Sequence, residues 1–246
     1  MGAGFAGFRT TRRYQPAIEE TILAELRTKL APGDVLLVRS EHKLTAALLP
    51  GFWAHAALYL GGRRELRGLG IQGHPHVQKH WAAIPEHGGN FGQVIEAISP
   101  RAVISSLERC LFADHVAVLR PSLNAIDQAA ALTEAFGHLG KPYDFEFDFN
   151  VTSRIVCTEL IYRCYHGRGG IRFPLVKRLG RFTLSGSDII NMFLDSRSGA
   201  ARENRGPFRL VSLVLKRGEQ AHFVPENDAI QVLRDIQSGK RPGKGS

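Results

Sequence analysis

The chain has 246 residues, of which 43% are hydrophobic, and it carries a formal net charge of +9. This length suits one large domain or two small ones, and the hydrophobic fraction is enough to bury a core, which excludes a disordered chain. No run of about 18 apolar residues is present, which excludes a membrane-spanning helix. The first residues hold no apolar block followed by a small-residue cleavage site, so we expect no secretory leader and a cytoplasmic protein.

The net charge bears on the kind of partner, and the cysteines bear on the redox compartment. Lysine and arginine outnumber the acidic residues 32 to 23, but they are scattered along the chain rather than interleaved with aromatic residues. A solvated basic surface is therefore favoured over a nucleic-acid interface, and we expect no nucleic-acid partner. Three cysteines (Cys110, Cys157 and Cys164) do not make a disulfide framework and suit a reducing compartment with at most one functional thiol.

Apolar spacing and the positions of Gly and Pro predict the elements. In chain order these are a helix at 17–30, a strand at 34–38, a helical turn at 43–49, a strand at 53–60, strands at 94–99 and 103–105, a helical turn at 107–112, a strand at 115–119, helices at 124–139, 157–165 and 187–194, a strand at 208–216 and a helix at 227–236. Strands clustered in the middle, with helices before and after them, predict an α+β fold.

The domain organisation follows from the segments that lack periodicity. We expect a flexible basic arm at 1–15, a single domain over 16–239 and a disordered tail at 240–246. Residues 63–92 are rich in Gly and His, and we interpret them as a surface insertion or lid.

Cys157 is the first candidate for chemistry. It follows a polar, turn-rich loop and opens an apolar segment of helical period that runs to about Tyr165. The first turn of a helix offers unpaired backbone N–H groups and the positive end of the helix dipole, and both favour thiolate over thiol. A buried cysteine can equally be a small apolar core residue, so this position alone does not establish a nucleophile.

A thiolate needs a proton partner, and His55 is the best candidate among ten histidines. Most of the others fall in predicted loops, whereas His55 lies inside the apolar strand 53–60. The two-residue period of a strand places Trp53, His55 and Tyr59 on one face, so we expect both aromatic side chains to line the site. A core or edge histidine with no catalytic part is the alternative.

Glu96 is a carboxylate in the middle of the apolar strand Val94 to Ile98. A buried, unpaired carboxylate is strongly unfavourable, so it needs a cationic or N–H partner. His55 and Glu96 on neighbouring strands would satisfy each other and leave the second ring nitrogen for Cys157. This is the nucleophile, base and orienting-residue arrangement of acyl-transfer enzymes; an edge position with Glu96 in water is the alternative.

Several of these segments together resemble the NlpC superfamily of papain-like cysteine hydrolases, in its circularly permuted YiiX/YebB-like branch. The resembling segments are Gly-Asp-Val-Leu-Leu-Val at 33–38, Trp-Ala-His-Ala-Ala-Leu-Tyr-Leu-Gly at 53–61, Val-Ile-Glu-Ala at 94–97, Gly-Lys-Pro-Tyr-Asp-Phe at 140–145 and Val-Cys-Thr-Glu-Leu-Ile-Tyr at 156–162. They run in the permuted order, with the histidine first and the cysteine last. The resemblance covers about residues 32–166 and leaves out the ends of the chain and the insertion.

The resemblance implies a permuted papain-like fold, with a small, mostly antiparallel sheet packed against the helix that carries the nucleophile. It implies a catalytic triad of Cys157, His55 and Glu96, and it makes Tyr143 a candidate for lining the site. Thr158 replaces the serine common in relatives, keeps a hydroxyl and is also expected at the site. Glu159 is given a structural role in the first turn of the helix or in an ion pair.

The expected activity is cysteine-dependent hydrolysis of an amide bond, in a peptide or isopeptide-like substrate, through a thioester intermediate and without a cofactor. A thiol acyltransferase or lipid hydrolase of the lecithin retinol acyltransferase type is the alternative, as is a binding module without turnover. A metal site at His74, His76, His80 and His87 lacks a completing ligand pattern, so we predict no metal. Weak membrane contact through Phe5 and Phe8 of the arm stays open; oligomeric state is not determined.

Overall fold

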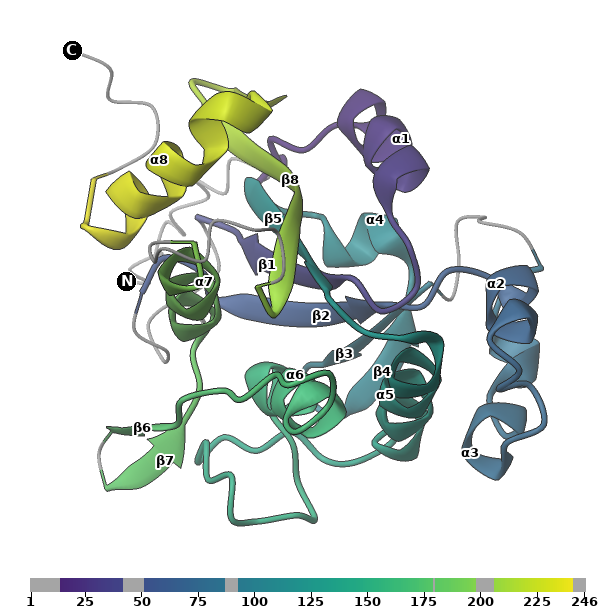
Figure 1. Ribbon diagram of the computed structural model, residues 1–246. Coiled ribbons are helices and arrows are strands. Elements are labelled where there is room, and N and C mark those ends of the chain that lie inside the picture. Colours follow the sequence, from purple (N-terminus) through teal and green to yellow (C-terminus); the bar gives the residue numbers. More distant parts are fainter. Residues whose placement is uncertain (1–13, 42–50, 87–92, 179, 198–205, 241–246) are drawn as a thin grey trace, which may run out of the picture.

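An antiparallel sheet of seven strands forms the centre of the fold, in the order β4-β3-β2-β1-β5-β8-β9 (Figure 1). The computed structural model describes residues 14–41, 51–86, 93–178, 180–197 and 206–240. The strands are β1 (Val35–Arg39), β2 (His55–Tyr59), β3 (Val94–Ala97), β4 (Ala102–Ser105), β5 (His115–Pro121), β8 (Phe208–Arg217) and β9 (Gln220–Phe223), and a separate hairpin pairs β6 (Val176–Arg178) with β7 (Arg181–Thr183). The sheet is antiparallel as expected, and it is larger than the small sheet predicted.

Helices cover both faces of this sheet (Figure 1). They are α1 (Glu20–Lys29), α2 (Arg63–Gly68), α3 (Pro75–Gln78), α4 (Leu107–Cys110), α5 (Ala125–Gly137), α6 (Cys157–Tyr165), α7 (Gly186–Asp195) and α8 (Glu226–Gln237), with a short 3-10 helix η2 (Trp81–Ala83). The core on one face contains buried side chains of α5, α6, α7 and α8. The core on the other face contains those of α1 and α4.

The apolar run of β1 shows why both faces are buried. Val35 and Leu37 point into the core with α5 to α8, while Leu36 and Val38 point into the core with α1 and α4. Successive side chains of a strand alternate between faces, so a strand that is covered on both sides must be apolar at every position. The same alternation on β2 separates Ala56 and Leu58 from Ala57 and Tyr59.

The register of the central strands places the polar residues of interest close together. Val38 of β1 pairs with His55, and Ala57 of β2 pairs with Glu96 of β3. His55 and Glu96 are therefore diagonal neighbours on one face, which is within reach of long side chains. His55 is the first residue of β2, so its ring lies at the end of the strand.

The segment after β2 differs from the predicted insertion. The described part of the predicted insertion, 63–86, forms α2, α3 and η2, and Leu66, Val77 and Ile84 are buried in the core. The helix α3 packs against α5 (Figure 1). Each of these helices is too short to show a helical period in the sequence, which is why the segment looked irregular.

Other differences are smaller. The strands β6, β7 and β9 were not predicted, because their sequences (Val-Lys-Arg, Arg-Phe-Thr and Gln-Ala-His-Phe) are short and contain no apolar run. The predicted turn at 43–49, the end of the insertion at 87–92, nearly all of the basic arm and the tail from 241 lie outside the described residues. Among the described helices, none combines the length and the apolar character needed to cross a bilayer.

Candidate active site

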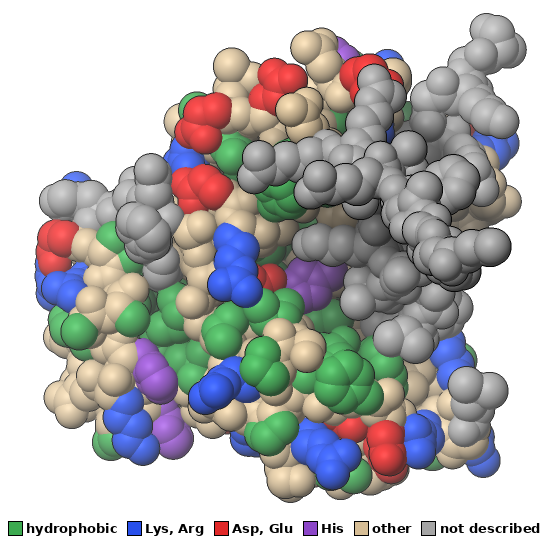
Figure 2. All heavy atoms as spheres, turned by 180° about the vertical axis from the view of Figure 1, so that it is seen from behind, with side chains coloured by type: hydrophobic (Ala, Val, Ile, Leu, Met, Phe, Trp, Pro, Cys, Tyr) green, Lys and Arg blue, Asp and Glu red, His purple; other side chains and the backbone are tan. Residues whose placement is uncertain are grey.

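A cavity of about 300 Å³ opens where the first residue of α6 meets the sheet. Its polar walls come from β2, β3 and α4, and its apolar wall comes from the loop that precedes α6. Figure 2 shows this hollowed face, with histidine and acidic side chains visible beside hydrophobic ones and a basic one. The lining residues include Cys157, His55, Glu96 and Tyr143, which are four of the residues expected at the site.

Cys157 is the first residue of α6 and is 2% exposed. Burial raises the pKa of its thiol, but the hydrogen bond and the charge of His55 lower it, as do the backbone N–H groups of Ala56 and Thr158. The net pKa lies below that of an ordinary thiol. The helix supplies part of this effect, because the first N–H groups of a helix have no partner within it.

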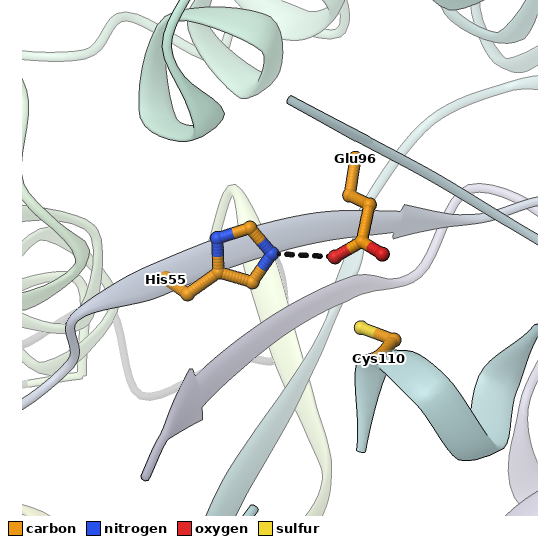
Figure 3. Close-up of side chains that lie close together, drawn as sticks. All are labelled: His55, Glu96 and Cys110. Carbon is orange, nitrogen blue, oxygen red and sulfur yellow. Dashed lines mark hydrogen bonds and ion pairs between the residues drawn. The ribbon is translucent and has the colours of Figure 1, made fainter. Parts of the chain in front are cut away.

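Glu96 is hydrogen-bonded to the ring of His55. Nε2 of His55 lies 2.8 Å from Oε2 of Glu96 (Figure 3). The hydroxyl of Ser105, on the neighbouring strand β4, donates to the other carboxylate oxygen. Glu96 is 3% exposed, and its pKa is nevertheless lowered, because the bonds and charges around it outweigh the effect of burial.

The three side chains therefore form one chain of interactions. Nε2 of His55 is occupied by Glu96, which leaves Nδ1 for the sulfur of Cys157, with which the ring also forms a hydrogen bond. Burial lowers the pKa of His55, but the bonds to Cys157 and Glu96 and the charges of both raise it to about 10. A lowered thiol pKa beside a raised imidazole pKa favours a thiolate–imidazolium pair at neutral pH.

The apolar wall of the cavity is a loop held in place by one buried carboxylate. Asp144 accepts hydrogen bonds from the backbone N–H groups of Glu146 and Asp148, at 3.0 and 2.8 Å. Between them Phe147 adopts a positive φ of 55°, which is uncommon for a residue other than glycine. The rings of Phe147 and Phe145 both contact Tyr143 edge-on, so three aromatic side chains form one wall.

Tyr143 lies close enough to Cys157 to respond to its charge. Burial raises the pKa of the Tyr143 phenol, and the charge of Cys157 raises it further. The hydroxyl therefore stays protonated beside the thiolate and is a hydrogen-bond donor.

Three residues expected at the site lie elsewhere in the structure. Trp53 is fully buried in the core with α5 to α8, and Tyr59 is buried in the opposite core with α1 and α4. Trp53 precedes the first residue of β2, so the strand alternation that the prediction assumed does not extend to it. Thr158 is buried, and its hydroxyl has no hydrogen-bond partner among the described residues. None of the three is in the lining of the described cavity.

Glu159 is 1% exposed and forms an ion pair with Arg163 one turn further along α6, at 2.9 Å. Arg163 also donates to the backbone carbonyl of Phe149, at 2.6 Å. This pair links α6 to the loop that forms the aromatic wall, which is a structural role of the kind expected for Glu159.

Sequence reasoning missed Ser105, Arg109 and Cys110. All three follow β3 in the chain, and Arg109 and Cys110 line the cavity while Ser105 holds Glu96. Ser105 had one available signal, since it ends the predicted strand 103–105, which follows the strand of Glu96 in the chain. Arg109 and Cys110 had none, because α4 is a single turn whose direction is set by packing.

The histidines of the expected surface loop do not converge on one point. His74 and His76 line a separate cavity beside α5, while His80 stacks on Phe136; His87 lies outside the described residues. Among the described residues, the group placed so that it could hold a metal ion is His55, Glu96 and Cys110.

An antiparallel sheet, a cysteine that begins a helix packed on it and a histidine from an earlier strand are features of a papain-like cysteine hydrolase in permuted order. Residues 29–209 match the family model of the permuted papain-like amidase enzymes, YaeF/YiiX, C92 family. This match covers most of the chain, so the protein belongs to that family and is a cysteine hydrolase of the amidase type.

Comparison with solved structures gives a weaker likeness. The crystal structure of metalloprotein yiiX from Escherichia coli O157:H7 aligns with 80% of this chain and 97% of its own, at 19% sequence identity and a TM-score of 0.43. No curated protein matches the chain.

Proposed function

We propose that the protein cleaves an amide bond of a small peptide or isopeptide-like substrate, with Cys157 as nucleophile, His55 as acid and base, and Glu96 as the residue that orients His55. The observation that carries this proposal is the continuous set of interactions from Cys157 through His55 to Glu96 inside one cavity. A cysteine, a histidine and an orienting side chain in these roles form the catalytic unit of acyl-transfer enzymes.

The first step is attack of the Cys157 thiolate on the substrate carbonyl carbon. The backbone N–H of Cys157 supports the developing oxyanion, since it belongs to the unpaired first turn of α6. We assign the second donor to the hydroxyl of Tyr143, which lines the same cavity and is kept protonated. The imidazolium of His55 then protonates the leaving amine, and a thioester to Cys157 remains.

The second step releases the acyl group. Neutral His55 takes a proton from water, and the resulting hydroxide attacks the thioester. The carboxylic acid is released, and Cys157 returns to the thiolate form. Glu96 supports each protonation of the ring, because its carboxylate bonds Nε2 throughout. The aromatic wall of Tyr143, Phe145 and Phe147 provides an apolar contact for the acyl part of the substrate.

A catalytic cysteine is active only while its thiol is reduced, and the cytoplasm is a reducing compartment. We therefore keep the prediction of a cytoplasmic location.

The test is a panel of fluorogenic acyl amides and acyl esters assayed with the wild type and Cys157→Ala. We expect turnover of an amide by the wild type and a loss of at least about 10³-fold in Cys157→Ala, as for removal of a nucleophile that acts in a catalytic unit. Intact-mass spectrometry should detect the acyl group on the wild type and not on this variant.

Cys164→Ala is the matched control, because Cys164 is a second buried cysteine on the same helix and lies outside the cavity. This variant should keep full activity. Activity that survives Cys157→Ala would contradict the proposal. Transfer of the acyl group to an added acceptor in preference to water would identify an acyltransferase, and absence of any acyl adduct would identify a binding module.

A further inference from the structure

A second thiol lies at the same cavity as the proposed nucleophile. Cys110 is the last residue of α4, and Figure 3 shows its sulfur turned toward the carboxylate of Glu96 and the Nε2 edge of His55. One ligand atom from each of His55, Glu96 and Cys110 lies within 4.8 Å of the other two. The proposed mechanism uses His55 and Glu96 and assigns no role to Cys110.

We propose that His55, Glu96 and Cys110 bind one divalent ion of the zinc class, and that this ion inhibits the enzyme reversibly. The donor set is one thiolate sulfur, one imidazole nitrogen and one carboxylate oxygen. These are the ligands that Zn²⁺ takes in proteins, whereas Mg²⁺ and Ca²⁺ prefer oxygen alone.

The distances require a small contraction. Zinc bonds of roughly 2.0–2.3 Å in a tetrahedral arrangement put the ligand atoms roughly 3.3–3.6 Å apart. His55 and Glu96 are already closer than that, at 2.8 Å, and separate slightly when an ion replaces the proton between them. The ligand atoms lie within 4.8 Å of one another, so the sulfur of Cys110 needs to move by roughly 1.5 Å at most, which a side-chain rotation on one short helix provides.

The surroundings suit an ion that comes and goes. All three residues line the cavity of about 300 Å³, so the ion has a path to them and a substrate-sized space for a fourth ligand such as water. Ser105 donates to the carboxylate oxygen that does not face His55, and this bond holds the Glu96 carboxylate in position to bind an ion. The guanidinium of Arg109 lies at the same cavity and lowers the pKa of Glu96. The two negative charges of the thiolate and the carboxylate balance the two positive charges of the ion.

Binding is balanced by loss of protons. The ion replaces the proton on Nε2 of His55 and the proton on the Cys110 sulfur, and both go to solvent. Nδ1 of His55 keeps its proton toward Cys157, so Cys157 is not a ligand in this arrangement. The inhibitory effect rests on the proposed function, because the ion occupies the nitrogen and the carboxylate that the mechanism needs.

The test titrates Zn²⁺ into metal-free protein by calorimetry, and Co²⁺ in parallel to detect the thiolate-to-cobalt absorption band. The wild type, Cys157→Ala and Cys164→Ala should each bind one equivalent with the same affinity. Cys110→Ala should bind at least about 10–100-fold more weakly, since loss of a ligand costs no less than loss of a second-shell partner. Cys110→Ser serves if the alanine variant does not fold, as judged by thermal unfolding.

Activity gives the second measurement. Zn²⁺ should inhibit the wild type and Cys164→Ala, chelation should restore them, and Cys110→Ala should need a higher Zn²⁺ concentration by the same factor as its loss of affinity. The proposal is overturned by any of three results: unchanged binding in Cys110→Ala, loss of binding in Cys157→Ala, or no binding to the wild type. An inactive wild type would contradict the proposed function while the binding result stays readable.

Discussion

His55 shows how neighbouring side chains set the chemistry of one residue. Its side chain is 24% exposed, and burial alone would favour the neutral ring. Two partners with anionic forms, Cys157 on one nitrogen and Glu96 on the other, reverse that preference. The ring can therefore hold a proton at neutral pH and give it to a leaving group.

The amidase activity should follow a bell-shaped dependence on pH. As pH falls, the thiolate is lost at a pKa below that of an ordinary thiol, and as pH rises, His55 loses its proton at about 10. The kcat/KM of the amidase reaction measures both limbs, whereas the rate of iodoacetamide alkylation, which needs the thiolate but no proton donor, measures the acidic limb alone.

Glu96→Gln should narrow the profile from both sides. The neutral amide no longer supports the charged ring, so the basic limb moves to lower pH, and the thiolate loses part of its partner, so the acidic limb moves to higher pH. A profile identical to that of the wild type would show that Glu96 does not act on His55.

Tyr143→Phe tests the second oxyanion donor. If the hydroxyl stabilises the transition state, its loss should lower kcat about 10²–10³-fold while KM changes little. Tyr162→Phe is the control, because Tyr162 lies on α6 and stacks on His166 away from the cavity. Equal kcat in both variants would remove Tyr143 from the reaction.

At the scale of elements, the position of α7 depends on close approach to the segment that leads into β2. Gly186 is the first residue of α7, and a Cβ on it would lie 2.7 Å from the backbone oxygen of Trp53 and 2.8 Å from its Cβ. The side chain of Trp53 is in turn fully buried two residues before His55. A glycine here lets the helix and the strand pack at a distance that no other residue permits.

Gly186→Ala should destabilise the protein by about 1–3 kcal/mol, the usual cost of overpacking, because the contacts are with backbone and Cβ atoms that cannot rotate away. Gly68→Ala at the exposed end of α2 is the matched control, since a Cβ there meets nothing within 4 Å. It should leave stability unchanged or raise it slightly through better helix propensity. Urea denaturation measures both, and equal stability of the two variants would contradict the packing argument.

At the scale of the whole molecule, one sheet joins two cores. Every residue of β1 from Val35 to Val38 contributes to one core or the other, so neither core can open without exposing the strands that the other needs. We therefore expect the two cores to unfold as one cooperative unit, and the single domain over 16–239 stays a prediction.

Leu26→Ala and Leu132→Ala test this cooperativity from opposite faces. Leu26 of α1 and Leu132 of α5 are both fully buried, so each change should cost about 2–5 kcal/mol. Both tryptophans, Trp53 and Trp81, pack in the core with Leu132. In guanidinium titrations, Leu26→Ala should nevertheless move the fluorescence midpoint as far as the circular-dichroism midpoint. A fluorescence transition that stays in place would reveal two independent units.

The sequence by itself determined the long elements and indicated which side chains are candidates for the reaction. Apolar periods specify α5, α6 and α8, and polar residues stand out in apolar strands at His55 and Glu96 because burial without a partner is so costly. The family match over residues 29–209 confirms the fold and the class of enzyme that those segments predicted. The roles of the individual residues stay predictions.

Only the tertiary structure decided what surrounds them. Trp53 lies before the first paired residue of β2, so the alternation of the strand does not extend to it. Tyr59 lies on the same face as His55 but at the opposite end of β2. Arg109 and Cys110 line the cavity because the orientation of the single helical turn α4 is set by its packing against the core. Local periodicity records which residues are buried, whereas which of them face one another is set by the packing of the whole sheet.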